Sequence, residues 1–137
     1  MQGKDVKAFK NLMCNYQFNL DRVNRYRAQI EDCYAKLGAV PQSIDFAKVR
    51  THSLPNKDFE YMLRDNIQFY EEKLKFYESQ IKYVDEKLNL MPVETRKMAS
   101  DMFILGESEI AVASRYFISP SGMRKRINNA IKKALDD

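Results

Sequence analysis

The sequence contains few of the residues that form turns, disulfides or metal sites in small folds. Its 137 residues include no Trp, one His, two Cys, four Gly and four Pro. So few Gly and Pro leave little turn chemistry for hairpins and sheets, and this scarcity favours an all-α fold. The single histidine, His52, has no His, Cys or acid at metal-ligand spacing. There is also no Gly-rich phosphate loop, nucleophile elbow or catalytic carboxylate pair, so we expect no metal, no cofactor and no enzymatic activity.

The sequence also lacks the patterns of oxidation, export and membrane insertion. Cys14 and Cys33 are nineteen residues apart within one predicted helix, which holds them beyond the reach of a disulfide. The N-terminal residues carry no apolar signal-peptide core, and no run approaches the roughly eighteen apolar residues of a membrane helix. We therefore expect a cytoplasmic protein without membrane contact, made of one domain or of one small domain with an extension.

Two long helical patterns fill the first two thirds of the chain. Residues 5–37 place apolar side chains in steps of three and four, broken only at Arg27, and Gly38 follows as a stop signal. Residues 58–91 repeat the step without a miss, at Leu63, Ile67, Tyr70, Leu74, Tyr77, Ile81, Val84, Leu88 and Met91. The intervening residues 39–57 contain two prolines and no sustained period, which is typical of a connector.

Two helices of similar length on either side of a connector predict a long antiparallel helical hairpin, resembling a coiled coil, over residues 1–91. Phe59, Phe69 and Phe76 widen the apolar surface beyond one seam. This extra surface leaves area for dimerisation, for another partner, or for docking of the C-terminal residues.

Three shorter helices are predicted for residues 92–137. Pro92 can open a helix over residues 93–105, which Gly106 ends, and a second helix covers residues 108–116. Ser119 and Pro120 then begin the last helix, because Ser accepts a hydrogen bond from the first turn and Pro needs no N–H there. Three helices are the smallest plan that encloses a core, so residues 92–137 are predicted to form a second domain.

The charge of the last helix is one-sided. Residues 110–135 hold six Lys or Arg and no Asp or Glu. One face is apolar, with Met123, Ile127, Ala130, Ile131, Ala134 and Leu135. The other is basic and rich in amides, with Ser121, Arg124, Lys125, Asn128, Asn129, Lys132 and Lys133. A capped helix with an apolar back and a basic front suits the major groove of DNA.

Residues 106–135 resemble the helix-turn-helix of sigma factor region 4, the sigma-70 region 4-like motif that many regulators share. The matching positions are Gly106, Ser108, Val112, Ala113, Tyr116, Ile118, Ser119, Met123 and Ile127. Phe117 stands where the family usually has Gly, at a position that often requires a positive φ. We therefore expect an altered turn, a strained Phe117, or burial of its ring against the hairpin. Gly122 stands where Thr or Ser is common.

The layout of a long hairpin before a sigma-like module resembles the phage and prophage regulators of the RinA and ArpU families. This resemblance implies a sequence-specific DNA-binding transcriptional regulator of phage or prophage genes, with late or packaging genes as targets in some members. The partners it implies are double-stranded DNA and RNA polymerase, and a hairpin of this kind suits a homo-dimer or a higher oligomer.

The same resemblance implies roles for individual side chains. Residues at the start and middle of the recognition helix are expected to contact base edges, namely Ser121, Arg124, Lys125 and Asn128. Residues expected to contact phosphates are Arg115, Ser119, Arg126, Lys132 and Lys133. Two alternatives stay open: an interaction protein that binds RNA polymerase or a sigma factor without reading DNA, and a phage DNA-packaging component such as a small terminase.

Overall fold

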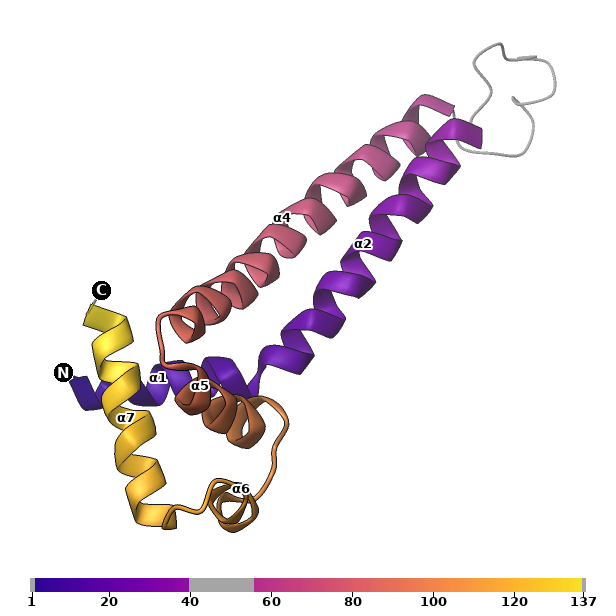
Figure 1. The fold of residues 1–137 in the computed structure, drawn as a ribbon. Coiled ribbons are helices and arrows are strands. Elements are labelled where there is room, and N and C mark those ends of the chain that lie inside the picture. Colours follow the sequence, from indigo (N-terminus) through magenta and orange to yellow (C-terminus); the bar gives the residue numbers. More distant parts are fainter. Residues whose placement is uncertain (1, 40–55, 137) are drawn as a thin grey trace. The chain divides into compact units, whose positions relative to one another are not determined.

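The computed structural model describes residues 2–39 and 56–136, and the elements within these ranges are all helices. In chain order they are α1 (Gln2–Cys14), α2 (Tyr16–Ala39), α4 (Asn56–Asn89), α5 (Val93–Ala99), the π-helix η1 (Ser100–Ile104), α6 (Glu109–Arg115) and α7 (Pro120–Asp136) (Figure 1). The predicted all-α fold is confirmed. Most of the predicted connector, residues 40–55, lies outside the described residues.

The first predicted helix is divided at Asn15, so the prediction of one continuous helix over residues 5–37 was wrong. Backbone hydrogen bonds still pass the break, from Asn15 N to Asn11 O at 3.0 Å and from Asn19 N to Asn15 O at 2.8 Å. On the N-terminal side of the break, α1 buries Phe9 in a core shared with the C-terminal helices. Periodicity could not reveal the division, because steps of three and four describe a buried helix face whichever neighbour covers it.

The chain forms two compact units, one of residues 1–20 and 78–137 and the other of residues 21–77. The segment predicted as a separate C-terminal domain, residues 92–137, therefore shares its unit with α1 and the end of α4. The core of this first unit is built from Val6, Phe9, Met13, Val84, Leu88, Met91, Met98, Ala99, Val112, Ala113, Met123, Ile127, Ile131 and Ala134.

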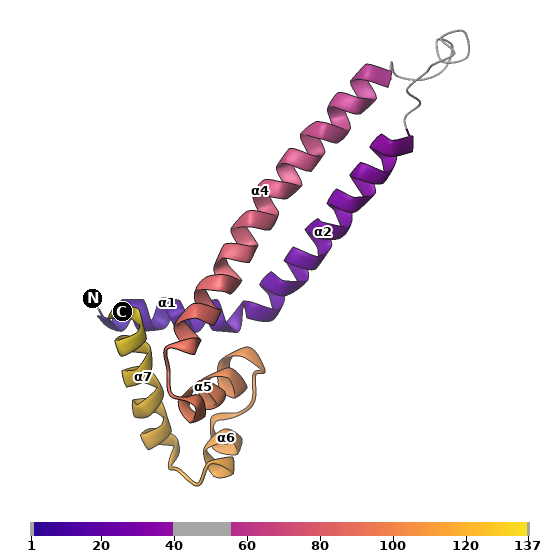
Figure 2. The ribbon, with the colours of Figure 1, turned by 45° about the horizontal axis from the view of Figure 1, so that its top comes forward.

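Helix α7 packs against several helices of the first unit. It contacts α1, α5 and α6, and both views show α1 and α5 beside it (Figures 1 and 2). Met123, Ile127 and Ile131 of α7 are almost completely buried, at 1% exposure or less. Ala113 of α6 is also buried and belongs to the same core as these residues of α7.

The predicted helix over residues 93–105 is present as α5 followed directly by η1. Its last turn is wider than an α-helical turn, because Leu105 N donates to Ser100 O at 3.0 Å across five residues. Gly106 follows with a φ of 73°, the left-handed conformation that commonly ends a helix at glycine. The predicted stop signal therefore works by the expected mechanism.

The second unit joins the C-terminal part of α2 to the N-terminal part of α4. Its core contains Cys33, Leu63 and Ile67, with Leu37, Phe59 and Tyr70 packed around them. The ring of Tyr26 stacks on that of Tyr77, with centroids 6.0 Å apart and planes 15° apart. The residues of the predicted heptad seam in this unit are thus buried or half-buried, which confirms the apolar face assigned to α4. Cys14 and Cys33 are both free thiols.

Candidate nucleic-acid interface

The turn between α6 and α7 is held by backbone hydrogen bonds and by one side-chain cap. Phe117 N donates to Ser114 O at 3.2 Å, and Ile118 N donates to Ala113 O at 3.1 Å. At the start of α7, the Ser119 hydroxyl accepts a hydrogen bond from Gly122 N at 3.1 Å. The cap predicted from the Ser-Pro pair is confirmed.

Phe117 has a φ of 55°, so a bulky residue occupies the left-handed conformation that the sequence motif usually gives to glycine. Its side chain is 97% exposed. Of the expected outcomes, strain at Phe117 is the one observed, and burial of its ring within the described part of the chain is not. The strain is confined to the backbone of this one residue within the turn.

The candidate base-contacting residues fall into two groups. Ser121, Arg124 and Lys125 are exposed on the first turns of α7. Arg124 is also ion-paired, with its Nε 3.1 Å from Glu109 Oε1 of α6. Asn128 is half-buried and faces α1, so the exposure expected for it was wrong. The reason is the packing of α1 against α7, which the sequence pattern did not predict.

Both arginines among the candidate phosphate-contacting residues form ion pairs with acidic side chains of the first unit. Arg115 Nη1 lies 2.8 Å from Asp101 Oδ2 and 2.9 Å from Glu107 Oε2. The carboxylate of Glu107, and to a smaller extent that of Asp101, raises the pKa of Arg115 above its usual value. Arg126 Nε donates to Thr95 Oγ1 at 3.1 Å, and its Nη1 lies 3.4 Å from Glu94 Oε1. Arg115 thus anchors α6 to η1, and Arg126 anchors α7 to α5.

The remaining candidates for phosphate contact have different surroundings. The Ser119 hydroxyl serves as the helix cap, and Lys133 is exposed at the C-terminal end of α7. Lys132 is half-buried and faces α1. The candidates that the structure leaves together on one open surface are Ser121, Arg124 and Lys125.

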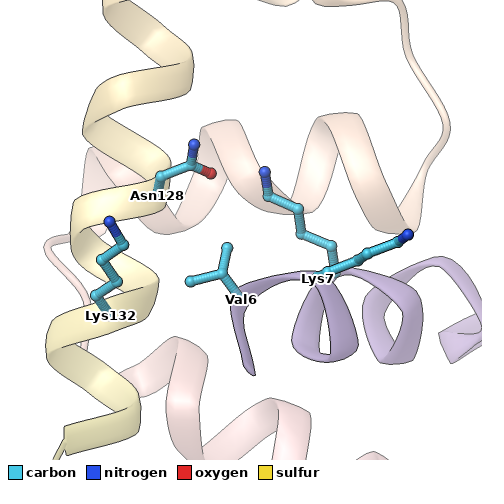
Figure 3. Close-up of a pocket in the computed structure, with 5 residues that line it drawn as sticks. Val6, Lys7, Asn128 and Lys132 are labelled. Carbon is cyan, nitrogen blue, oxygen red and sulfur yellow. The ribbon is translucent and has the colours of Figure 1, made fainter. Parts of the chain in front are cut away.

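Sequence reasoning missed the basic side chains that α1 brings to α7. Lys7 and Lys10 line a pocket of about 280 Å³ together with Val6, Asn128 and Lys132 (Figure 3). The available signal was the spacing of Lys4, Lys7 and Lys10, which recur every third residue. That spacing places Lys7 and Lys10 on one side of α1, but it does not predict that α1 packs against α7 in the first unit.

Comparisons of the chain with protein-family models, with curated proteins and with solved structures found no match. Among residues 2–39 and 56–136, no group of three or more His, Cys, Asp or Glu could hold a metal ion. None of the helices in these ranges has the length and apolar character needed to cross a membrane.

Proposed function

We propose that this chain is a sequence-specific DNA-binding transcriptional regulator of the phage and prophage type, without enzymatic activity. In this proposal α6 and α7 form a sigma-like helix-turn-helix, and α7 enters the major groove. The long helices of residues 1–91 act as a hairpin that joins two copies of the chain or holds another protein. The proposal rests on the contacts of α7 and on the sequence resemblance of residues 106–135.

One observation carries the proposal. The capped start of α7 exposes Ser121, Arg124 and Lys125, while Met123 and Ile127 on the opposite side of the helix are buried in the core. A helix fixed along its back by a core presents its front rigidly. Helix-turn-helix proteins read bases mainly with the N-terminal residues of the second helix, and these three side chains occupy that position.

The ion pair between Arg124 and Glu109 is compatible with DNA binding. The two side chains are 58% and 31% exposed, and exposed pairs of this kind contribute only ~0–1 kcal/mol. A guanine can replace the carboxylate, because its O6 and N7 accept two hydrogen bonds from one guanidinium. In free protein Glu109 would hold Arg124 extended, which lowers the entropy lost when a base is bound.

Selection of bound fragments from random DNA tests the proposal, with one enriched motif as the expected result. The double variant Arg124→Ala with Lys125→Ala should bind that motif at least about tenfold more weakly, since each lost bidentate contact costs ~1–3 kcal/mol. Circular dichroism should show unchanged helix content. The matched control is Lys57→Ala with Lys75→Ala, which removes two exposed charges from α4 and should leave the affinity unchanged.

Two results would contradict the proposal. One is the absence of any enriched motif from the selection. The other is an Arg124→Ala/Lys125→Ala variant that binds with the affinity and salt dependence of the unmodified chain, which would remove the recognition-helix assignment.

A second candidate function is docking to a protein such as RNA polymerase without reading DNA, and the turn supplies the observation that favours it. The ring of Phe117 projects into solvent beside a shallow groove lined by Val93, Glu94, Lys97, Arg115 and Tyr116. Exposed aromatic rings of this kind are common anchors in protein interfaces. Capture of polymerase subunits that is lost in Phe117→Gly, without an enriched DNA motif, would favour this function over the first.

A further inference from the structure

We infer that the pocket between α1 and α7 is a binding site for a phosphate group. It is lined by Val6, Lys7, Lys10, Asn128 and Lys132 (Figure 3). The phosphate could belong to the DNA backbone or to a small phosphorylated molecule, and the chemistry of recognition is the same for both. Only the DNA source rests on the proposed function.

The lining is cationic and contains no acid. Three of its five residues are lysines, and they come from two different helices. Within the described part of the chain, no ion pair engages Lys7 or Lys132. Like charges brought together by packing repel one another, and an anion that joins them removes this repulsion. A phosphate group carries negative charge, and its oxygens accept charge-assisted hydrogen bonds from lysine ammonium groups. It is therefore the expected ligand of this pocket.

Lys10 of the lining has an aromatic ring and a carboxylate nearby. Its ammonium lies over the ring of Phe103, 5.5 Å from the centroid. Burial lowers the pKa of Lys10, although the nearby carboxylate of Glu109 acts in the opposite direction. That carboxylate does not line the pocket, and it is already paired with Arg124 at 3.1 Å. A bound anion would give Lys10 a countercharge inside the pocket itself.

Asn128 adds an amide to the lysines of the lining. Its Oδ1 is buried and has no hydrogen-bond partner among the described residues. In Figure 3 this oxygen lies on the side of the lysine side chains of α1, which are hydrogen-bond donors. The Nδ2 of the same amide is also a donor, and it is the atom of Asn128 that can bond to a phosphate oxygen.

The size of the pocket limits the ligand. Its volume of about 280 Å³ lies at the lower end of the range of small-molecule sites. Val6 provides its apolar contact, and no aromatic ring lines it for stacking against a base. The site therefore suits a phosphate or a compact phosphate ester better than a whole nucleotide.

The first test uses the full chain and inorganic phosphate. Calorimetric titration and thermal unfolding are compared in phosphate and in chloride at equal ionic strength. We expect saturable phosphate binding and a higher melting temperature in phosphate. Lys7→Gln with Lys132→Gln should weaken phosphate binding at least about tenfold, because two charge-assisted hydrogen bonds are lost. Asn128→Asp, which places a carboxylate in the pocket, should abolish it.

The matched control is Lys57→Gln with Lys75→Gln, which removes the same charge from α4 and should bind phosphate like the unmodified chain. Absence of saturable phosphate binding would overturn the inference. So would equal binding by the unmodified chain, the pocket variant and the control variant, since this would indicate a diffuse effect of surface charge.

A second measurement distinguishes the two sources of phosphate. If the group belongs to DNA, Lys7→Gln with Lys132→Gln should weaken binding to all sequences alike and reduce the slope of log affinity against log salt by about one to two. The enriched motif should stay the same. If the group belongs to a small molecule, the variant should lose phosphate binding while DNA affinity and salt slope are unchanged. Failure of all DNA binding would remove the proposed function and leave the phosphate titration as a separate result.

Discussion

Phe117 is the residue at which local conformational preference and the fold conflict most clearly. A left-handed backbone at a non-glycine residue costs ~1 kcal/mol or more, and this ring gains almost nothing in return because it is 97% exposed. Residues held in such a conformation are often retained for function. The exposed ring beside the groove of Val93 and Tyr116 is consistent with that view.

Phe117→Gly should therefore stabilise the protein by about 1 kcal/mol, because glycine adopts the φ of 55° without a Cβ clash. Urea unfolding of the purified chain measures this change. Phe117→Ala is the matched control, since it removes the ring but keeps the Cβ, and its stability should equal that of the unmodified chain. Equal stability of the glycine and alanine variants would show that no strain resides at this position.

At the scale of the element, the start of α7 contains two residues whose effects are coupled. The Ser119 hydroxyl accepts a hydrogen bond from Gly122 N, and a Cβ added at Gly122 would lie 2.9 Å from the same hydroxyl. The position where the motif that residues 106–135 resemble usually has Thr or Ser is thus closed to larger side chains unless the cap is released. Glycine fits here despite its low helix propensity because the hydroxyl of the Ser119 cap occupies the space beside it.

This coupling predicts a non-additive double-mutant cycle. Gly122→Ala alone should give little or no stabilisation, because the gain of ~1 kcal/mol in helix propensity is offset by loss of the cap, also worth ~1 kcal/mol. In a Ser119→Ala background the same change should stabilise by about 1 kcal/mol. Thermal unfolding of the four proteins measures the coupling. Additive effects would show that the hydroxyl can rotate away without cost.

The junction of α1 and α2 is held to the end of α4 by a hydrogen bond from the Tyr16 hydroxyl to Asp85 Oδ1, at 2.9 Å. Burial, this hydrogen bond and the charge of Asp85 together raise the pKa of Tyr16 above its ordinary value of 10.0. A raised pKa means that the folded chain holds the proton more tightly than the unfolded chain. The resulting stability is complete below about pH 10 and is lost as pH rises through the higher pKa.

Tyr16→Phe should lower stability at neutral pH by about 1 kcal/mol through loss of the hydrogen bond, and should reduce the further loss between neutral and strongly alkaline pH. Asp85→Asn should reduce the alkaline loss as well, because the charge that opposes ionisation of Tyr16 is gone. Denaturant unfolding at a series of pH values measures both. An alkaline loss of the same size in all three proteins would contradict the assignment.

At the scale of the whole molecule, the sequence predicted where the helices begin and end better than it predicted which helices pack against one another. The heptads of α4, the Gly106 stop and the Ser119 cap were found because each depends on neighbours within a few residues. The packing of α1 on α7 depends on residues more than a hundred positions apart, and no local pattern records it. For this reason Asn128 was expected on an open surface, and the basic pocket with Lys7 was not foreseen.

Exposed apolar residues of the second unit provide the last prediction, which concerns self-association. Met62, Phe69 and Phe76 follow one another at intervals of seven along α4 and are 45%, 51% and 55% exposed. A heptad interval places them in one stripe on the helix, separate from the seam of Leu63 and Ile67. The same stripe on a second copy is complementary to it in length and in apolar character, as a two-fold interface requires.

Phe69→Ser with Phe76→Ser should therefore raise the dissociation constant of a dimer at least about tenfold, because burying one Phe side chain contributes ~1.5–3 kcal/mol. Sedimentation equilibrium over a range of protein concentrations measures this change. Tyr61→Ser, which removes a ring that is 57% exposed at a neighbouring position of α4, is the matched control and should leave the dimer intact. A chain that is already monomeric at high concentration, or a double variant that dimerises like the unmodified chain, would contradict the interface.

If the dimer holds, the enriched DNA motif should contain two half-sites, because two-fold symmetry in the protein is matched by two-fold symmetry in its operator.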